Sequence, residues 1–382
     1  SLTANVIGAT ATHLDLNGAT ALVLSDTGGD GSAILIDELT ASTIAATTLT
    51  VADATSGTID IDYFGDNVVD INQGHVLNNV DLDAATTSSF SYTATVGNVT
   101  ATLVNTGAGN LTINAANGTM ALVNLDTTTG AVDIDATGNI TITDNGGVTS
   151  AGAAVINIDS SAGFIRNSAA SDGTADISTD GGTITLVANT GIADSTGSAG
   201  LDIDSSTGNV SLTNDGTTAG TFVDYVSNAG DNFGLTVVAT TTSGNVTFDS
   251  LSTGTLTLTS VNTAANPLSV TADGNVIATD VDTTTGTLTL ATSAGTMVLT
   301  DVDSTEGAMN IDATGAITVT DVDSTTGEIN IETSGASDIA IAVAGIGSAS
   351  GNVIVTANNN AGGTITLADG TEKITVAGAD AD

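Results

Sequence analysis

The segment GTMVLTDVDSTEGAMNIDATGAITVTD, residues 295–321, decides the fold, because GTMALVNLDTTTGAVDIDATGNITITD at residues 118–144 nearly repeats it. The two segments agree at 17 of 27 positions. A shorter repeat is clearest in 274–335, where evenly spaced glycines open the strand-like stretches: Gly274, Gly295 and Gly315 open one series, and Gly286, Gly307 and Gly327 the other. A short, regular period of this kind is typical of a solenoid, in which each repeat packs only on its neighbours.

Apolar and polar residues alternate along both strand-like stretches of each repeat, as they do in strands with one buried face. Five positions are apolar in every repeat: Val276, Met297 and Ile317; Ala278, Leu299 and Val319; Val281, Val302 and Val322; Leu288, Met309 and Ile329; Leu290, Ile311 and Ile331. Five inward side chains cannot form a core alone, but stacked repeats can share one. The sequence therefore predicts an all-β chain folded as a parallel β-helix (β-solenoid) with coils of about 20–21 residues.

Two details refine this prediction. The apolar spacing lengthens by one residue between Ala278 and Val281, which predicts a bulge or corner at Thr279–Asp280. A string of immunoglobulin-like sandwiches is the alternative all-β fold, but those recur at about 100 residues and usually bury a Trp or Tyr. The chain has no Trp and three Tyr, which favours the solenoid.

The repeat divides the chain unevenly. Residues 96–382 follow it and are expected to form the solenoid coils. Residues 1–95 follow it less closely and hold the aromatic segments YFGD (63–66) and SFSY (89–92). We expect 1–95 to be a less regular β region that serves as a cap or an assembly segment.

The charge excludes several classes of partner. The 382 residues include 43 acidic and 2 basic side chains, for a net charge of −41. Nucleic acid and anionic membrane surfaces are excluded, because phosphate binding needs Lys and Arg. The chain has no apolar run of about 18 residues, so the sequence predicts no membrane-spanning segment. The chain has no Cys, so its stability must come from strand pairing and packing.

The acidic corners are the main candidate site. A DVD triplet recurs in three successive repeats, and its valine is expected to face inward, so that both aspartates face outward. These aspartates are Asp280, Asp282, Asp301, Asp303, Asp321 and Asp323. Stacked coils would bring like charges close together, and calcium, a hard cation that takes several oxygen ligands, would relieve the repulsion. The alternative is a solvated acidic edge that keeps the molecules apart.

Catalysis is not expected. Parallel β-helices also house polysaccharide lyases and hydrolases, but a lyase needs a basic residue at its site. Arg166 and Lys373 would lie about ten coils apart along the axis and cannot share a site. His13 and His75 are isolated and are expected to be surface residues. Paired carboxylates could serve a glycosidase, but aspartate is so common here that pairs arise by chance.

Two binding functions remain as alternatives. Threonine rows such as Thr287 and Thr289 are compatible with ice binding, but the place of Thr289 is taken by Asn310 and then Asn330, which breaks the array. A glycan-binding adhesin stalk would need aromatic stacking platforms. The aromatic residues that could supply them are Tyr63, Phe64, Phe90, Tyr92 and Tyr225.

The phrases GNITIT, GTLTLTS, GNVIATD and GGTITL resemble the haemagglutination-type β-helical repeats of large bacterial surface exoproteins and adhesins, such as filamentous haemagglutinin. The resemblance covers residues 96–382 and implies an exported, rod-like surface protein. A start at Ser1, without Met or a signal peptide, fits a processed export product or an excised segment. The expected location is therefore extracellular or on a prokaryotic cell surface. The sequence departs from the family in its acidity and in showing no two-partner secretion domain near Ser1.

Both ends of the sequence are strand-like, in SLTANVIGATATHLDLNG (1–18) and GGTITLADGTEKITVAGADAD (362–382). Open solenoid ends expose unpaired backbone groups and apolar side chains, which two copies can cover for each other. The sequence therefore predicts a non-catalytic structural protein, such as a filament or surface-layer subunit, whose main partner is a second copy bound head to tail.

Overall fold

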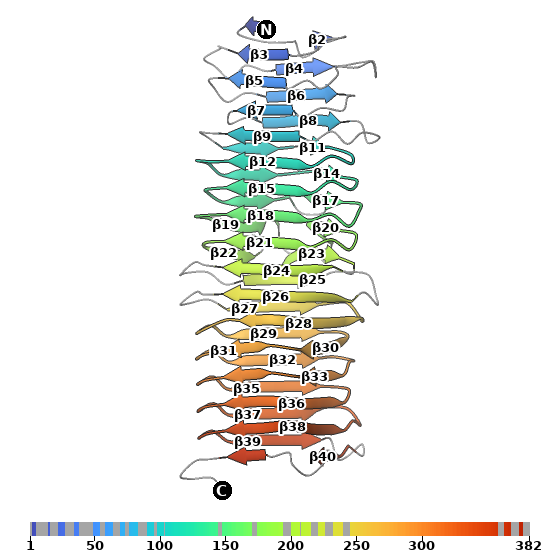
Figure 1. Ribbon diagram of the computed structural model, residues 1–382, viewed down its shortest axis with the longest axis vertical. Helices are drawn as coiled ribbons and strands as arrows, with labels where there is room; N and C mark the ends of the chain where they lie inside the picture. The colour runs from blue at the N-terminus through green and yellow to red at the C-terminus, as the bar shows by residue number, and fades with distance from the viewer. Residues whose placement is uncertain are drawn as a thin grey trace. The chain divides into compact units, whose positions relative to one another are not determined.

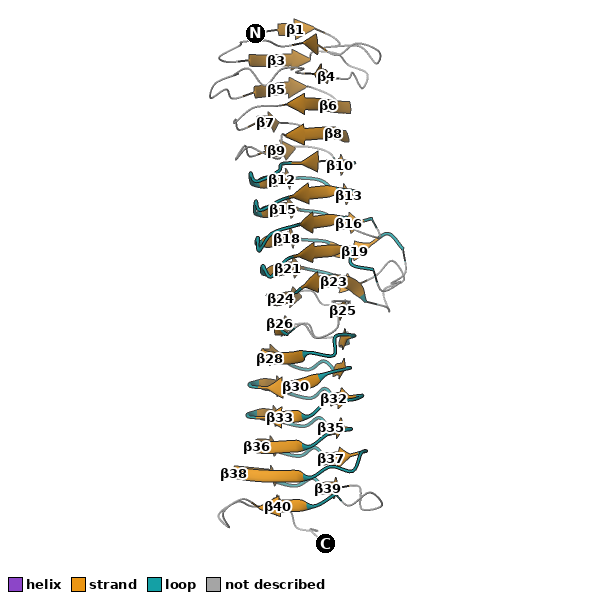
Figure 2. Cartoon of the chain, turned by 90° about the vertical axis from the view of Figure 1, so that its right-hand side faces the viewer, coloured by secondary structure: helices purple, strands orange, loops and turns teal. Residues whose placement is uncertain are grey.

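The computed structural model describes strands between residues 2 and 94 and most of the chain beyond residue 98. The described ranges are 2–4, 14–15, 22–26, 34–37, 49–53, 58–63, 69–72, 76–82, 90–94, 98–102, 104–143, 147–169, 174–193, 200–206, 208–214, 221–225, 232–239, 245–357, 363–367 and 374–376. Within these ranges the secondary structure is strand, with no helix, and every strand pairing is parallel (Figures 1 and 2). The chain is a β-solenoid, as predicted.

The chain divides into two compact units, Ser1–Asn189 and Thr190–Asp382. Strand β9 (Phe90–Ala94) ends just before residue 95 and pairs over its whole length with β12 (Leu111–Ala115), which lies one coil later. The functional division at residue 95 stays a prediction.

In the first unit, one face of the coils is a sheet of single strands. Its members are β1 (Leu2–Ala4), β3 (Leu22–Asp26), β5 (Leu49–Asp53), β7 (Val69–Asn72), β9, β12, β15 (Val132–Ala136), β18 (Ile156–Ser160) and β21 (Ile184–Ala188). The strands of the other face become divided in two by a corner as the chain proceeds. They are β2 (Leu14–Asp15), β4 (Ile34–Asp37), β6 (Thr58–Tyr63) and β8 (Val76–Leu82), then the pairs β10 (Val99–Ala101) and β11 (Val104–Asn105), β13 (Met120–Leu122) and β14 (Leu125–Thr127), β16 (Ile140–Ile142) and β17 (Val148–Ser150), and β19 (Phe164–Asn167) and β20 (Ile177–Thr179).

The second unit has the same two kinds of face. The single strands are β25 (Thr221–Tyr225), β27 (Val246–Ser250), β29 (Leu268–Ala272), β32 (Leu288–Thr292), β35 (Met309–Ala313), β37 (Ile329–Thr333) and β39 (Val353–Ala357), with β22 (Gly191–Ala193) and β23 (Leu201–Ser205) before them. The cornered face holds β24 (Asn209–Asn214), β26 (Phe233–Ala239), β28 (Thr255–Asn262), β30 (Asn275–Ala278) and β31 (Val281–Thr283), β33 (Met297–Leu299) and β34 (Val302–Ser304), β36 (Ile317–Ser324), β38 (Ile339–Ser348), and β40 (Ile365–Leu367) and β41 (Ile374–Val376).

The strand registers confirm the five predicted core positions. Val276 pairs with Met297 and Met297 with Ile317, and the other four positions continue from coil to coil in the same way. All of these side chains are buried. The predicted corner is also present, because β30 ends at Ala278 and β31 begins at Val281.

Coil length is less uniform than the sequence predicts. Leu256 pairs with Val276 and Val276 with Met297, which keeps the predicted spacing. Longer steps occur in both units: Val132 pairs with Ile156 and Ile156 with Ile184 in the first, and Ile339 pairs with Ile365 in the second. The extra residues lie between strands, where an insertion leaves the register intact.

The turn that follows the DVD triplet at 301–303 is held by a close glycine contact with the preceding coil and by a hydrogen bond from a buried hydroxyl group. A Cβ added to Gly307 would come within 1.8 Å of the carbonyl oxygen of Gly286, one coil earlier, so no larger residue fits there. The hydroxyl of Ser304 donates to the carbonyl of Gly307 at 2.9 Å. Thr127 makes the same contact with Gly130 in the first unit, at 2.8 Å. The S/T-x-x-G spacing therefore has a structural cause.

Candidate functional site

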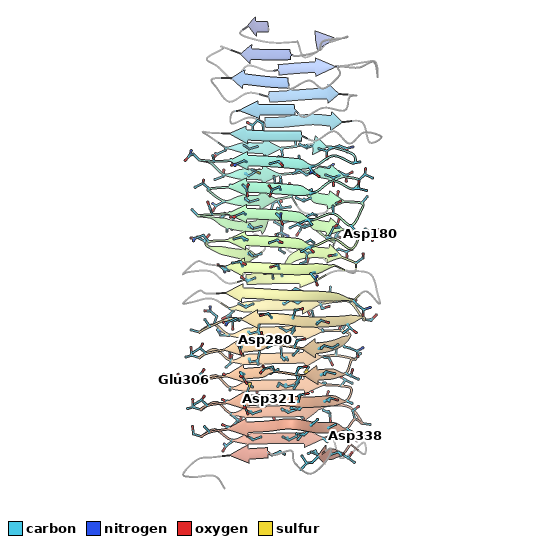
Figure 3. All side chains as sticks on the ribbon, viewed as in Figure 1. Asp180, Asp280, Glu306, Asp321 and Asp338 are labelled. Carbon is cyan, nitrogen blue, oxygen red and sulfur yellow. The ribbon has the colours of Figure 1, made fainter. Side chains whose placement is uncertain are left out.

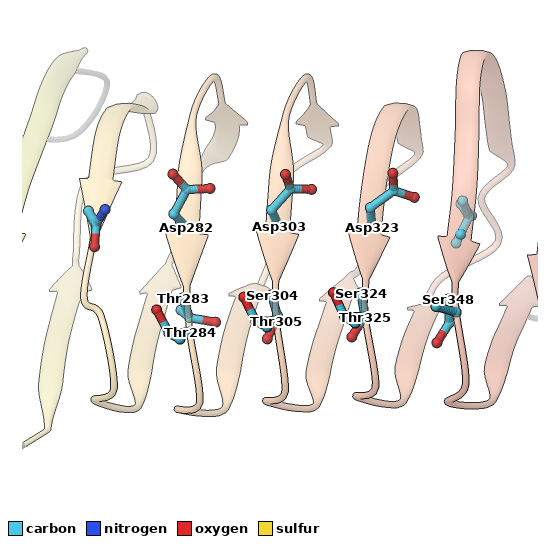
Figure 4. A pocket seen from close by; sticks show the side chains of 14 residues that line it. Asp282, Thr283, Thr284, Asp303, Ser304, Thr305, Asp323, Ser324, Thr325 and Ser348 are labelled. Atoms are coloured by element: carbon cyan, nitrogen blue, oxygen red, sulfur yellow. The ribbon is translucent and has the colours of Figure 1, made fainter.

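The acidic corners of the second unit form a ladder on adjacent strands. Asp282 of β31 pairs in register with Asp303 of β34, and Asp303 pairs with Asp323 of β36. Their side chains point to the same side of the strands and lie side by side on neighbouring strands (Figure 4). Neighbouring parallel strands lie about 4.8 Å apart, so three carboxylates stand at that spacing. We call these three residues the aspartate ladder.

The ladder has defined ends. In the coil before it, Asn262 pairs with Asp282, and in the coil after it, Gly347 pairs with Asp323. A Cβ added to Gly347 would come within 2.4 Å of Asp323 Oδ1, so the carboxylate of Asp323 leans over bare backbone. The ladder is therefore three carboxylates long, between an amide and a glycine.

The other three predicted aspartates lie beside the ladder. Asp280 and Asp301 occupy the corners before β31 and β34, and Asp321 lies within β36, at its register shift against β38. Figure 3 shows Asp280 and Asp321 on the same side of the second unit. Asp280 is exposed and accepts a hydrogen bond of 3.4 Å from the hydroxyl of Ser260. The structure thus brings all six predicted residues into one acidic surface.

The electrostatics of this surface show that the six carboxyl groups interact. Partial burial, followed by repulsion from Asp301, Asp323, Asp282 and Asp321, raises the pKa of Asp303 to about 6. Burial is also the first cause of the raised pKa of Asp282, with Asp280 and Asp301 next. The pKa of Asp321 is raised by burial and then by Asp323 and Asp301. Like charges are therefore held together here at an energetic cost.

A groove of about 720 Å³ runs beside the ladder. Its lining includes the three ladder aspartates and, from the same coils, the row of outward threonines Thr284, Thr305 and Thr325. This row was not predicted from the sequence, although a hydroxyl residue follows every DVD triplet at both of the next two positions. The groove thus has carboxylates along one side and hydroxyls along the other.

The hydroxyl groups directly after the triplets have a different role. Ser304 donates to a carbonyl in its own turn, and Ser324 and Ser348 each accept a hydrogen bond of 2.8 Å from a glycine N–H three residues ahead. These side chains are buried and fix the corner rather than offering ligands to the groove.

The described side chains do not form a cage for a metal ion. No group of three or more His, Cys, Asp or Glu side chains converges on one point anywhere in the described ranges. An ion at the ladder would therefore bridge two neighbouring carboxylates and take its remaining ligands from water. Calcium prefers oxygen ligands at 2.3–2.6 Å, and two such bonds span about the spacing of neighbouring strands.

The residues considered for other functions have separate positions. Arg166 lies over the ring of Phe164, 3.4 Å from its centroid. Tyr92 is fully buried, so the interpretation of Tyr92 as a glycan-stacking platform was wrong: it lies in the core register column with Ile113. Thr289 pairs with Asn310 and Asn310 with Asn330, so the register confirms that the threonine array is broken.

His13, His75, Phe64 and Lys373 lie outside the described residues, as do the side chains of Tyr63, Phe90 and Tyr225.

Comparison with known proteins gives no relative: no protein-family model, curated protein or solved structure matches the chain. Within the described ranges, no helix could span a membrane.

Proposed function

We propose that this chain is a non-catalytic structural protein of the prokaryotic cell exterior, which assembles head to tail into filaments. The observation that carries the proposal is the open core of the last described coil. Ile365 and Leu367 of β40 are each 45% exposed, whereas Ile339 and Ile341, their register partners one coil earlier, are fully buried. Ile374 of β41 is 46% exposed over Ile346, which is 1% exposed.

These exposed side chains occupy core positions and not surface positions. They continue columns that are apolar in the coils before them, so another coil placed on them would bury them as the earlier ones are buried. Burying apolar surface contributes about 25 cal/mol per Å². A second copy of the chain can supply that coil, and a contact between two different ends does not close on itself, so it grows a fibre.

The negative charge of the chain, including the aspartate ladder, determines the ionic conditions under which filaments would grow. A net charge of −41 opposes association, and the repulsion between exposed charges weakens as salt is added. We propose that divalent cations, calcium first among them, bridge neighbours among Asp280, Asp282, Asp301, Asp303, Asp321 and Asp323. The raised pKa values of Asp282, Asp303 and Asp321 support this role, because a cation would remove the repulsion that contributes to them.

The resemblance to bacterial surface repeats supports the extracellular location and keeps a glycan-binding adhesin stalk as the second candidate. That candidate has lost one platform, since Tyr92 is buried. The stacked face of Phe164 is covered by Arg166, so this aromatic ring offers no platform on that face either.

The test is growth of residues 1–382 in rising salt and calcium, followed by light scattering and electron microscopy. We expect filaments whose growth is abolished by Leu367→Asp, which puts a charge on the open core. Thr366→Asp is the matched control, because it adds the same charge to the same strand at an exposed position whose neighbour in register is Ala340. Particles that stay monodisperse under every condition would refute the proposal.

A further inference from the structure

Arg166 of β19 is the one Lys or Arg residue within the described ranges, in a chain that has 43 acidic side chains. Its guanidinium group lies over the ring of Phe164, 3.4 Å from the centroid. It makes no ion pair with any acidic residue that the structure describes. An aromatic ring of its own strand therefore holds the cation in place, and its charge has no described counterpart.

The surface that leads from Arg166 back along the solenoid is uncharged. Arg166 pairs in register with Thr141 of β16, and Thr141 pairs with Ala121 of β13. The outward residues at and directly before these three strands are Thr119, Ala121, Asn139, Thr141, Phe164 and Arg166, none of which is acidic. Asp126 lies beyond the corner, on β14. We call this surface the Arg166 face, and a carboxylate that approaches it meets a cation and no neighbouring anion.

The opposite face of the same coils carries the reverse charge. The outward residues of β15 and β18 include Asp133, Asp135 and Asp159, and Asp135 pairs in register with Asp159. Burial, followed by repulsion from Asp133 and Asp159, raises the pKa of Asp135. We call this surface the carboxylate face. The first unit thus has a cation on one face and clustered carboxylates on the other.

The two charged groups lie at nearly the same level along the solenoid. β19 directly follows β18 in the chain, so Arg166 and Asp159 belong to one coil, and Asp135 lies one coil earlier. Successive coils are about 4.8 Å apart. A second copy displaced sideways, without rotation, would therefore bring its carboxylate face against the Arg166 face with the charges about one strand spacing apart in level.

We propose that the Arg166 face of one copy docks side by side on the carboxylate face of a second copy, with Arg166 donating to Asp135. A guanidinium stacked on an aromatic ring keeps its N–H donors at the edge of its plane, where a carboxylate can accept two of them. The contact joins two different faces, so it repeats from copy to copy and forms a layer of parallel solenoids. It uses other surfaces than the head-to-tail contact proposed above and does not depend on it.

The net charge of −41 makes this contact weak without preventing it. In about 0.15 M salt, charges more than about 8 Å apart are largely screened, so repulsion between distant carboxylates of the two copies is small. The ion pair itself lies at contact distance and is screened less. Because a single ion pair between partly exposed side chains contributes little, association is expected at high protein concentration.

The test uses the full chain with Leu367→Asp, the substitution expected to block head-to-tail growth, so that side-by-side association is measured alone. Sedimentation velocity is recorded at rising protein concentration, after circular dichroism has confirmed the fold of each variant. We expect association that Arg166→Gln weakens by about fivefold, the upper range for an exposed ion pair. Asn310→Asp is the matched control, because it lowers the net charge by the same single unit at an exposed position of the second unit, and it should leave the association unchanged.

Exchange of the two charges identifies the partner residue. Arg166→Asp puts carboxylates on both faces, and Asp135→Arg puts a guanidinium group opposite Arg166, so neither variant should associate by itself. A mixture of the two variants should associate again, because every contact between unlike copies then joins a carboxylate to a guanidinium group. Both substitutions are made in the chain that carries Leu367→Asp.

Three results would overturn the proposal. Association that Arg166→Gln leaves unchanged would show that Arg166 is not the docking residue. A mixture of the exchanged variants that stays dissociated would rule out the pairing with Asp135. A Leu367→Asp chain that stays monomeric at every concentration would rule out the side-by-side contact, and it would not count against head-to-tail assembly, which is tested by growth of the unaltered chain.

Discussion

Asp126 in the first unit and Asp303 in the second occupy equivalent positions in two closely similar segments of sequence. Their neighbours in register differ in charge. Asp303 stands between Asp282 and Asp323. Asp126 stands between two neutral residues, Asn105 and Thr149, and the hydroxyl of Thr149 donates to Asp126 Oδ1 at 2.9 Å. The solenoid corner therefore does not require stacked charge, and the first unit shows how the same corner is built without it.

The two segments share the features that build the turn and differ in the residues that face solvent. Both corners keep the buried hydroxyl that bonds to a glycine three residues ahead, and both keep that glycine in contact with the preceding coil. They differ in the column that faces solvent. The residues of this column differ between the two units, so the fold does not require three stacked aspartates.

The largest expected effect tests the shared part of the corner. Gly130→Ala and Gly307→Ala should each destabilise the chain by roughly 3 kcal/mol, because the new methyl group would overlap a backbone carbonyl of the preceding coil. The measurement is the midpoint of chemical denaturation. Gly347→Ala is the control, since its new methyl group meets only the movable carboxylate of Asp323. Equal effects at Gly307 and Gly347 would contradict the backbone explanation.

Calcium should act on one of the two regions only. At ten times its dissociation constant, an ion bound only by the folded chain stabilises it by about 1.4 kcal/mol. We therefore expect millimolar calcium to raise the melting temperature, EDTA to lower it, and the triple variant Asp282→Asn, Asp303→Asn, Asp323→Asn to remove the response. Neutralising Asp249, Asp273 and Asp312 changes the charge equally and should leave the response in place. A melting curve that does not respond to calcium would leave a solvated edge as the role of the ladder.

A ladder can also be built where the chain has none. Asn105→Asp with Thr149→Asp would flank Asp126 with two carboxylates and remove its hydrogen bond from Thr149. We expect a loss of about 1 kcal/mol in stability at pH 7, on the scale of one hydrogen bond. The part of the loss that comes from repulsion should disappear at pH 3, where the two introduced carboxyl groups are protonated, whereas the part that comes from the lost hydrogen bond should remain. At pH 7, calcium should now stabilise the first unit as well. A loss of the same size at both pH values would show that stacked carboxylates carry no cost here.

The fold and the positions of the ladder aspartates could be predicted from the sequence for a physical reason: repeats of nearly constant length have a single consistent alignment, and that alignment is the strand register. Val276, Met297 and Ile317 fall into one column by alignment alone. The prediction for Tyr92 failed because the alignment of the repeats does not extend to this residue. Tyr92 lies in the less regular part of the repeat, and its column with Ile113 appears only in the strand pairing.

The groove could not be predicted from the alignment either. Its shape depends on how the outward threonines and the backbone at Gly347 are arranged in space. A strand register identifies neighbouring residues, but it does not determine how deep the surface between them is.

The smallest effect expected is the pH dependence of the ladder itself. The pKa of Asp303 is raised from 3.8 to about 6 in the folded chain, so the folded state holds this proton more tightly than the unfolded state does. The contribution of Asp303 to the free energy of unfolding is therefore most favourable below pH 4, falls as the pH rises from about 4 to about 6, and is constant above that. Asp303→Asn removes the titrating group and should remove this fall.

The free energy of unfolding should then exceed that of the parent by about 0.5 kcal/mol at pH 7, since Asp303 is only partly buried and solvent screens its repulsion, and should equal it near pH 3. Denaturation with urea at pH 3, 5 and 7 measures the difference. Asp126→Asn is the matched control and should give no gain at pH 7, because Asp126 has neutral neighbours and accepts a hydrogen bond. A gain of the same size in both variants would mean that the net charge of the chain, rather than the ladder, sets the effect.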